Sequence, residues 1–317
     1  MGIVIKSVTA ILILLLGIAG LSYAASIASE KPLDDAARAA APGEFVALSD
    51  GNIHYRWFGP EDGETIVMVH GFSTPNFIFA QNAEALALAG FRVLTFDHFG
   101  RGWSDRPETA YTPDFYDRAL VELTDALQLD RPFGLVGLSM GGVISAEFAA
   151  RHPERISKLF LFVPAGLSLA GEAGSMNDRI SNTPVLGEFV WQVFGKRILL
   201  GNSQYEEGSL PMENRLAGDV IVQMGFKGYF LSLLSSYRNL PMRDADQVFQ
   251  RVSSTGLPVM AVFGGRDTTV LPKSAERLAA AIPKAKIELL TDGDHGLNYK
   301  MHMVTSPMLI EYFSESQ

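Results

Sequence analysis

A glycine-rich turn around Ser139 constrains this chain more than any other feature. It joins an apolar run at 133–136 to a helix-forming run at 143–150, and Gly137 and Gly141 stand two positions to either side of the serine. A Gly-x-Ser-x-Gly pattern between a strand and a helix is typical of a sharp turn that exposes a nucleophilic hydroxyl. A side chain at either glycine would collide with nearby backbone. The alternative is an ordinary glycine-rich turn with an incidental serine.

Strand-like and helix-like segments alternate around this turn. The expected strands are 45–48, 53–57, 65–69, 92–96, 133–136, 159–163, 257–263 and 286–290; the expected helices are 76–90, 112–128, 143–150, 272–282 and 298–313. The first two strands flank an Asp-Gly turn, as in a hairpin. The others are mostly continuous apolar runs, as expected of strands buried on both faces. The pattern predicts an α/β fold with a mostly parallel central sheet and helices on both faces, in which reactive groups gather at the C-terminal ends of the strands.

Four motifs give the chain a resemblance to serine hydrolases of the α/β-hydrolase fold, from about Phe45 to the C-terminus. The motifs are His70-Gly71-Phe72, the loop 97–104, the turn at Ser139, and Gly264-Gly265-Arg266-Asp267 followed by Gly293-Asp294-His295. The resemblance implies that the N–H of Phe72 forms half of an oxyanion hole, and the N–H of Met140, at a helix N-terminus, can supply the other half. We expect His70 to brace its loop rather than to act as a base.

The resemblance also assigns the loop 97–104 and the long segment 166–256. In related sequences the loop is structural, with Asp97 and Arg101 tying its turn down. The segment shows helical pieces but no convincing strand, and about 90 residues are too many for an ordinary connection. We expect a helical cap inserted after the sixth strand. Most of its large apolar residues must form its own core, but we expect a minority to line a substrate pocket, and we name Trp103, Met224 and Phe226 as candidates.

A serine hydroxyl is a weak nucleophile, so it needs a base within hydrogen-bond reach and a group that orients the base. Of the six histidines, only His295 follows the last strand in a short Gly/Asp loop, and we predict that it is the base. The acid should follow an earlier strand, and Asp267 fits. Asp292 and Asp294 are nearer to His295 in the chain, but in the resembled family the residue before the histidine is not the acid. The order Ser139, Asp267, His295 is the one this fold uses.

The N-terminal segment is the feature of the sequence that best indicates where in the cell the protein is located. No residue between Lys6 and Glu30 is charged, and the helix from Val8 to Ala28 would span about 31 Å, close to the ~30 Å of a bilayer core. A cleaved signal peptide, with small residues near Ala24 and Ala28, is the alternative. We favour an uncleaved anchor at residues 8–28, which makes the protein extracytoplasmic, periplasmic or secreted.

Composition narrows the classes of partner. The net charge of −9, without a dense Lys/Arg block, argues against nucleic acid as a partner. Cysteine is absent and no metal-ligand cluster or nucleotide-binding loop stands out, so we expect no metal and no cofactor. We divide the chain into an N-terminal membrane segment (1–28), a linker (29–44), an α/β-hydrolase core (45–165 and 257–317) and a helical cap (166–256).

These features favour a serine carboxylic-ester hydrolase that acts on lipid-like esters, similar to monoacylglycerol lipases. A serine at the turn argues against haloalkane dehalogenase or epoxide hydrolase chemistry, because those relatives place aspartate there. Two alternatives stay open. One is C–C bond hydrolysis of diketo acids that arise from aromatic ring cleavage, and the other is a ligand-binding protein on a hydrolase scaffold.

Overall fold

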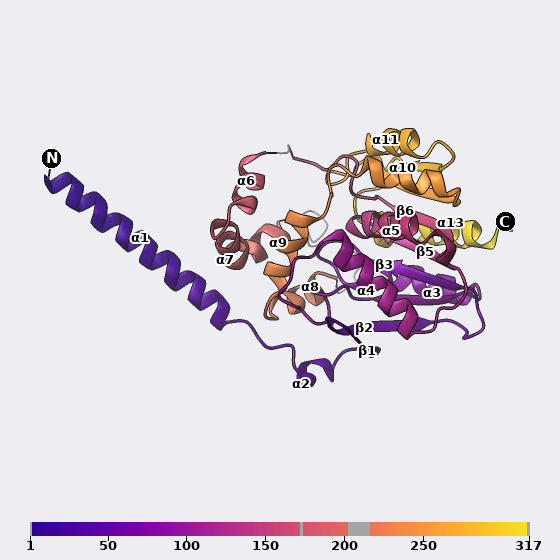
Figure 1. The fold of residues 1–317 in the computed structure, drawn as a ribbon, viewed down its shortest axis with the longest axis horizontal. Coiled ribbons are helices and arrows are strands. Elements are labelled where there is room, and N and C mark those ends of the chain that lie inside the picture. Colours follow the sequence, from indigo (N-terminus) through magenta and orange to yellow (C-terminus); the bar gives the residue numbers. More distant parts are fainter. Residues whose placement is uncertain (1, 172–173, 202–215, 316–317) are drawn as a thin grey trace.

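The computed structural model describes residues 2–171, 174–201 and 216–315, and it confirms an α/β fold built on one eight-stranded sheet (Figure 1). The strands are β1 (Glu44–Leu48), β2 (Gly51–Phe58), β3 (Thr65–Val69), β4 (Arg92–Phe96), β5 (Phe133–Leu138), β6 (Ile156–Phe162), β7 (Val259–Gly264) and β8 (Lys286–Leu290). They lie in the order β1-β2-β4-β3-β5-β6-β7-β8. β2 runs antiparallel to both β1 and β4, and every pair from β4 to β8 is parallel. The hairpin and the mostly parallel sheet are therefore as predicted.

Helices cover both faces of the sheet. α4, α5, α10 and α11 pack on one face, and α3 and α13 pack together on the other (Figure 1). The α-helices of the described residues are α1 (Gly2–Ala28), α2 (Asp35–Arg38), α3 (Ala80–Leu88), α4 (Pro113–Ala126), α5 (Met140–Arg151), α6 (Met176–Asn182), α7 (Leu186–Leu200), α8 (Leu216–Met224), α9 (Tyr229–Asn239), α10 (Asp246–Thr255), α11 (Ser274–Ala281), α12 (Leu297–Lys300) and α13 (His302–Ser314).

Two expected helices are each divided in the structure. The segment 76–90 begins as a 3-10 turn, Asn76–Phe79, before α3. The segment 298–313 is interrupted at Met301, whose φ of −111° and ψ of 30° are not helical, so α12 and α13 are separate. The helical periodicity of the sequence continues through both breaks, which is why it does not reveal them.

The strand register explains why distant motifs meet. Val69, the last residue of β3, pairs with Gly137 of β5, so the loops that carry Phe72 and Ser139 leave the sheet side by side. Gly264 of β7 pairs with Leu290 of β8, so the loops of Asp267 and His295 leave together in the same way. The parallel arrangement brings all four loops to one edge, as expected for such a sheet.

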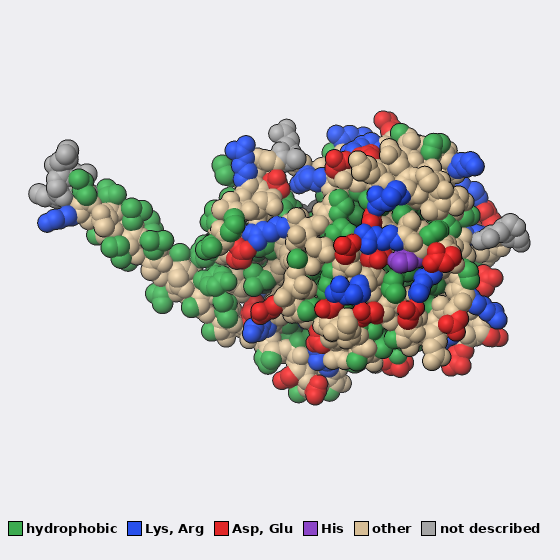
Figure 2. All heavy atoms as spheres, in the orientation of Figure 1, with side chains coloured by type: hydrophobic (Ala, Val, Ile, Leu, Met, Phe, Trp, Pro, Cys, Tyr) green, Lys and Arg blue, Asp and Glu red, His purple; other side chains and the backbone are tan. Residues whose placement is uncertain are grey.

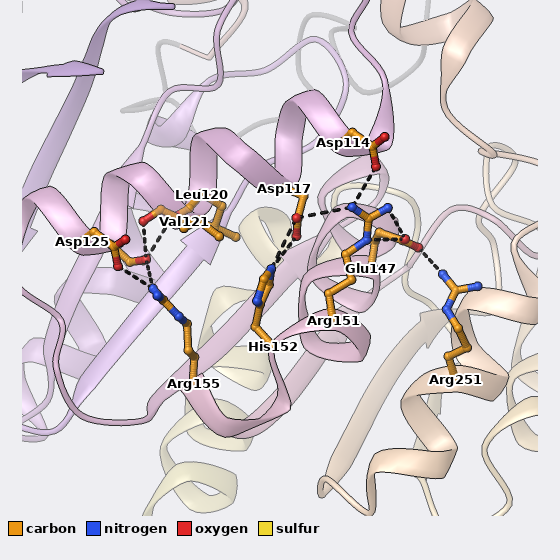
Figure 3. A network of polar contacts seen from close by, with 11 residues as sticks. Asp114, Asp117, Leu120, Val121, Asp125, Glu147, Arg151, His152, Arg155 and Arg251 are labelled. Carbon is orange, nitrogen blue, oxygen red and sulfur yellow. Dashed lines mark hydrogen bonds and ion pairs between the residues drawn. The ribbon is translucent and has the colours of Figure 1, made fainter. Parts of the chain in front are cut away.

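Ion pairs fasten the outer surface of α5, the helix that follows Ser139. Arg151 contacts Asp114 of α4 at 2.8 Å, Asp117 of α4 at 3.3 Å and Glu147 of its own helix at 2.8 Å (Figure 3). Glu147 also accepts a 2.6 Å contact from Arg251 of α10. The network ties the three neighbouring helices α4, α5 and α10 together.

The helices α6 to α9 lie between β6 and α10 in the chain and pack mainly on one another, α7 against α6 and α9. α10 differs, because it buries Val248, Phe249 and Val252 and packs against α5 and α11. The part of the segment 166–256 that stands apart from the sheet therefore ends before α10. The division into core and cap stays a prediction at its exact boundaries.

α1 projects away from the rest of the molecule and touches it at α7 (Figure 1). Residues Ile5–Ala28 are long and apolar enough to cross a membrane, and almost none of this stretch is buried. The segment expected to be a linker contains the short helix α2, capped by the side chain of Asp34, which accepts the N–H of Ala37.

Candidate active site

The turn at Ser139 has the strained geometry that the glycine spacing predicts. Ser139 has φ 54° and ψ −116°, a backbone conformation that residues other than glycine rarely adopt. A Cβ at Gly137 would lie 2.6 Å from the carbonyl oxygen of Gly141, and a Cβ at Gly141 would collide with the carbonyl oxygen of Val69. Only glycine fits at both positions, and the close approach keeps the serine at the edge of the sheet.

Ser139, His295 and Asp267 lie in one line of hydrogen bonds. His295 Nε2 is 3.0 Å from Ser139 Oγ, and His295 Nδ1 is 2.8 Å from Asp267 Oδ2. The other carboxylate oxygen, Asp267 Oδ1, accepts the N–H groups of Thr269 at 2.7 Å and Val270 at 2.9 Å. The carboxylate is thereby fixed with one oxygen free to orient the imidazole. The structure brings together the three side chains that the sequence singled out.

The two competing acids are engaged elsewhere. Asp292 forms an exposed ion pair with Arg266 at 2.6 Å. Asp294 contacts Lys300 Nζ at 2.6 Å and accepts the N–H of Gly296 at 2.9 Å. Neither carboxylate serves as the hydrogen-bond partner of His295, so the geometry favours Asp267.

The loop that carries Phe72 is braced from two sides. His70 Nδ1 donates to the carbonyl of Gly71 at 2.9 Å, and His70 Nε2 accepts the N–H of His98 at 2.9 Å. Burial lowers the pKa of His70 to about 4, so the ring is neutral and suited to these two bonds. His70 is therefore a brace, as expected. Phe72 lines the cavity beside Ser139. The N–H of Met140 is the first of α5, and the first N–H groups of a helix have no acceptor within the helix, so this N–H is free to bind another group.

Arg101 connects this loop to the cap. Its guanidinium is fully buried; Nε donates to the carbonyl of Phe72 at 2.9 Å, and another nitrogen donates to Ser236 Oγ of α9 at 2.8 Å. The sequence predicted that Arg101 ties down its own loop, and its guanidinium does donate to the carbonyl of Phe99 at 3.5 Å. The ties to Phe72 and to α9 were not predicted. Nothing in the local sequence indicates which cap helix lies above the loop.

A buried ion pair lies beneath the same loop. Asp97 accepts from His54 Nδ1 at 2.7 Å, from the backbone N–H of Asn76 at 2.9 Å and from that of Trp103 at 3.0 Å. Burial would raise the pKa of Asp97, but the bond from His54 and the other donors outweigh it and lower the pKa to about 2. Burial likewise opposes the charge on His54, but the bond and charge of Asp97 leave its pKa raised. His54 Nε2 lies 2.5 Å from the carbonyl of Pro42, so both ring nitrogens face acceptors, an arrangement that favours the doubly protonated ring.

A cavity of about 590 Å³ opens beside Ser139 and His295. Its wall comes from the strand-end loops and from α6, α7 and α9, and none of its described lining residues is Asp, Glu, Lys or Arg. Its apolar wall includes Ile78, Leu138, Leu169, Ile180, Val190, Trp191, Ile198, Leu199 and Met242. The site therefore suits a neutral, largely apolar group next to the serine.

The three residues predicted for the pocket do not line this cavity. The rings of Trp103 and Phe226 pack on each other with centroids 5.4 Å apart, and Phe226 pairs through its backbone with Lys31 of the linker. Met224 is buried at the end of α8, away from the cavity wall. The wall of the described cavity therefore lacks all three, because the end of α8 packs on the linker and Trp103 packs on Phe226.

Sequence reasoning missed Trp191 and Tyr237, the aromatic residues of the cap that line the cavity. On α7, Val190, Trp191, Ile198 and Leu199 recur at the spacing of one helix face, and this periodicity is the signal that was available. It identifies an apolar face but does not tell whether that face meets the cap core or the cavity.

Comparisons with known proteins identify the family to which the chain belongs. A family model of the α/β-hydrolase fold matches residues 64–188. A 2-hydroxy-6-oxononadienedioate/2-hydroxy-6-oxononatrienedioate hydrolase of Pseudomonas putida is 41% identical over 289 residues, which cover 86% of this chain and 96% of that protein. Lipase 3 of a Moraxella species is 27% identical over 238 residues, 74% of this chain and 72% of the lipase. An esterase from Exiguobacterium antarcticum superposes with a TM-score of 0.73 at 20% identity, over 86% of this chain and 100% of that one. The chain belongs to the α/β-hydrolase family and is a hydrolase.

Proposed function

We propose that this hydrolase is a serine carboxylic-ester hydrolase that acts on lipid-like or other apolar acyl esters. The observation that carries the proposal is the neutral, apolar cavity that opens directly onto the line from Ser139 through His295 to Asp267. A cavity whose described lining holds no Asp, Glu, Lys or Arg favours an acyl chain over a charged substrate, because an unpaired buried charge is costly.

In the proposed mechanism, Ser139 Oγ attacks the ester carbonyl carbon while His295 Nε2 removes its proton. Asp267 steadies the imidazolium through Nδ1. The N–H groups of Phe72 and Met140 hold the oxyanion, and each such donor contributes roughly 3–4 kcal/mol to lowering the barrier. His295 then gives its proton to the departing alcohol, and water, activated by the same histidine, releases the acid from Ser139.

The proposal includes an uncleaved membrane anchor. Tyr23 and Ser26 of α1 contact α7, and Glu30 accepts a hydrogen bond from Gln192 at 2.8 Å. Removal of the chain before residue 25 or 29 would delete contacts that fix α7, so these contacts favour retention of the segment.

A second candidate is hydrolysis of a C–C bond, and the 41% identical relative named for such a dioate substrate favours it. That substrate carries two carboxylates by its name. A cavity whose described lining lacks Lys and Arg offers them no cationic partner, and this counts against the candidate.

The two candidates separate in one assay series. The full chain in detergent is given p-nitrophenyl esters from acetyl to palmitoyl, a monoacylglycerol, and a vinylogous diketo acid, each with Ser139→Ala as control. We expect serine-dependent hydrolysis of the esters with a preference for a medium or long chain. Turnover of the diketo acid without turnover of any ester would overturn the proposal in favour of C–C hydrolysis.

A further inference from the structure

The cap helix α7 is fastened to the end of α1 that meets the body of the molecule. The rings of Tyr23 and Phe189 are stacked with centroids 6.4 Å apart. Ser26 Oγ donates to the carbonyl of Gln192 at 2.8 Å, and Gln192 Nε2 donates to Glu30 at 2.8 Å. If α1 crosses a membrane, α7 is held where the helix leaves it.

An apolar stripe on α7 leads from this contact to the mouth of the cavity. Val190, Phe194 and Ile198 are spaced four residues apart and so share one face of the helix. Val190 and Ile198 line the cavity, and Ile198 is also 48% exposed, which places it at the mouth. Phe194, 46% exposed, packs on Phe189 with ring centroids 6.1 Å apart. An aromatic series, Tyr23–Phe189–Phe194, therefore continues from α1 along the rim, as aromatic side chains do at a membrane interface.

The end of α8 lies beside the same place. The N–H of Lys31 donates to the carbonyl of Gly225 at 2.8 Å, and the N–H of Lys227 donates to the carbonyl of Lys31 at 2.9 Å. The end of α8 therefore lies next to the start of the linker that follows α1. α8 exposes Ile221 and Val222.

These exposed residues form what we call the collar, and Figure 2 shows apolar side chains gathered where α1 meets the cap. The collar consists of apolar Phe194, Ile198, Ile221 and Val222 with the exposed cations Lys31, Arg197 and Lys227. These cations accompany the exposed apolar groups in a chain whose net charge is −9, although the exposed Asp34 and Asp35 follow Lys31 in the linker. Such a combination suits a bilayer surface with anionic headgroups.

We propose that the collar docks on the surface of an anionic lipid bilayer, so that the cavity mouth at Ile198 opens onto the lipid and takes its acyl substrate from there. The inference rests on the proposed anchor and ester chemistry, and it adds the surface through which the substrate arrives. Apolar side chains at the rim replace water along the path of an acyl chain, and the cations meet lipid phosphates.

The first test does not depend on catalysis. The chain contains no cysteine, so Phe194→Cys creates a single site for an environment-sensitive dye, and Leu88→Cys, at a side chain 91% exposed on α3, is the matched control. The labelled full chain is reconstituted in phosphatidylcholine vesicles with and without phosphatidylglycerol. We expect blue-shifted emission and protection from iodide at position 194, stronger with phosphatidylglycerol, and neither effect at 88. Equal quenching at both positions would overturn the proposal. Protection that disappears as protein per vesicle is lowered would also overturn it, because a second copy of the chain would then cover the collar.

The second test uses activity. Phe194→Glu should leave hydrolysis of soluble p-nitrophenyl butyrate unchanged and lower hydrolysis of a long-chain ester embedded in the vesicles about tenfold, the ratio for roughly 1.4 kcal/mol of lost docking. Leu88→Glu should change neither rate. Equal rates for the two variants on the embedded ester refute the collar, whereas inactivity of the unmodified chain on every ester refutes the proposed function and leaves the dye result standing.

Discussion

Replacement of the fully buried Asp97 tests the account of how the loop beneath the active site is held. Asp97 Oδ1 accepts two N–H groups of Asn76, at 2.9 and 2.6 Å, and Oδ2 accepts from His54 at 2.7 Å and from the N–H of Trp103 at 3.0 Å. Asp97→Ala leaves these donors without their acceptor and leaves the charge of His54 buried. Removing one partner of a buried ion pair costs about 3–5 kcal/mol. At about 2–4 °C per kcal/mol for a domain of this size class, the midpoint should fall by roughly 6–20 °C.

The assay is thermal unfolding of the full chain in detergent, followed by near-ultraviolet circular dichroism, which reports the packed aromatic core. Asp114→Ala is the matched control, because Asp114 is 80% exposed and pairs with Arg151 on the surface. We expect the control to lose less than about 1 kcal/mol. The stability that Asp97 contributes should be present above its ordinary pKa of 3.8 and be lost as the pH falls towards its folded pKa of about 2. A midpoint for Asp97→Ala no lower than that of Asp114→Ala would refute the reasoning.

Three further predictions concern other parts of the molecule. The pKa of His54 is raised, so the stability that its charge contributes is fully present below pH 6.5 and is lost as the pH rises through the folded pKa. The difference in the midpoint of thermal unfolding between the unmodified chain and His54→Gln should therefore shrink with rising pH. A constant difference would contradict a charged His54. Gly137→Ala should lower kcat for ester hydrolysis roughly a hundredfold, because the new Cβ displaces the turn that carries Ser139. The control Gly218→Ala should leave kcat unchanged, because a Cβ there meets no atom within 4 Å. Equal rates for the two variants would argue against the close approach at Gly137. Trp191→Ala should move the chain-length optimum of the p-nitrophenyl ester series, because Trp191 lines the cavity, and Trp103→Ala should not; the reverse result would mean that the cavity wall is assigned incorrectly.

The positions of Ser139, Asp267 and His295 at one edge of the sheet were predictable because each residue follows a strand and carries a local signal. Ser139 lies between two glycines that no other residue can replace, and Asp267 and His295 lie in the loops that follow β7 and β8. Residues that follow parallel strands lie at one edge of the sheet, and this holds even if the predicted ends of the strands are off by a residue or two. The fold class and the order of these groups therefore follow from local pattern and general topology.

The pocket and the buried ion pair were not predictable in the same way. Trp103, Trp191 and Phe226 are all large and apolar, and only the packing of α7 over the cavity and of the end of α8 against the linker decides which of them lines the wall. For His54, the sequence predicts only that the residue lies in the N-terminal hairpin. Its charge depends on the three-dimensional approach of Asp97 and of the carbonyl of Pro42, and neither is visible as a motif.

The most direct test of the central claim is to trap the acyl-enzyme. The full chain is mixed with a long-chain p-nitrophenyl ester, quenched in acid within a turnover, digested and analysed by mass spectrometry, with Ser139→Ala and Asp292→Ala treated in parallel. We predict an acyl group on the peptide that contains Ser139, with the label and the turnover both lost in Ser139→Ala and both retained in Asp292→Ala. Continued ester turnover by Ser139→Ala, or an acyl group on a different residue, would contradict the proposed serine mechanism.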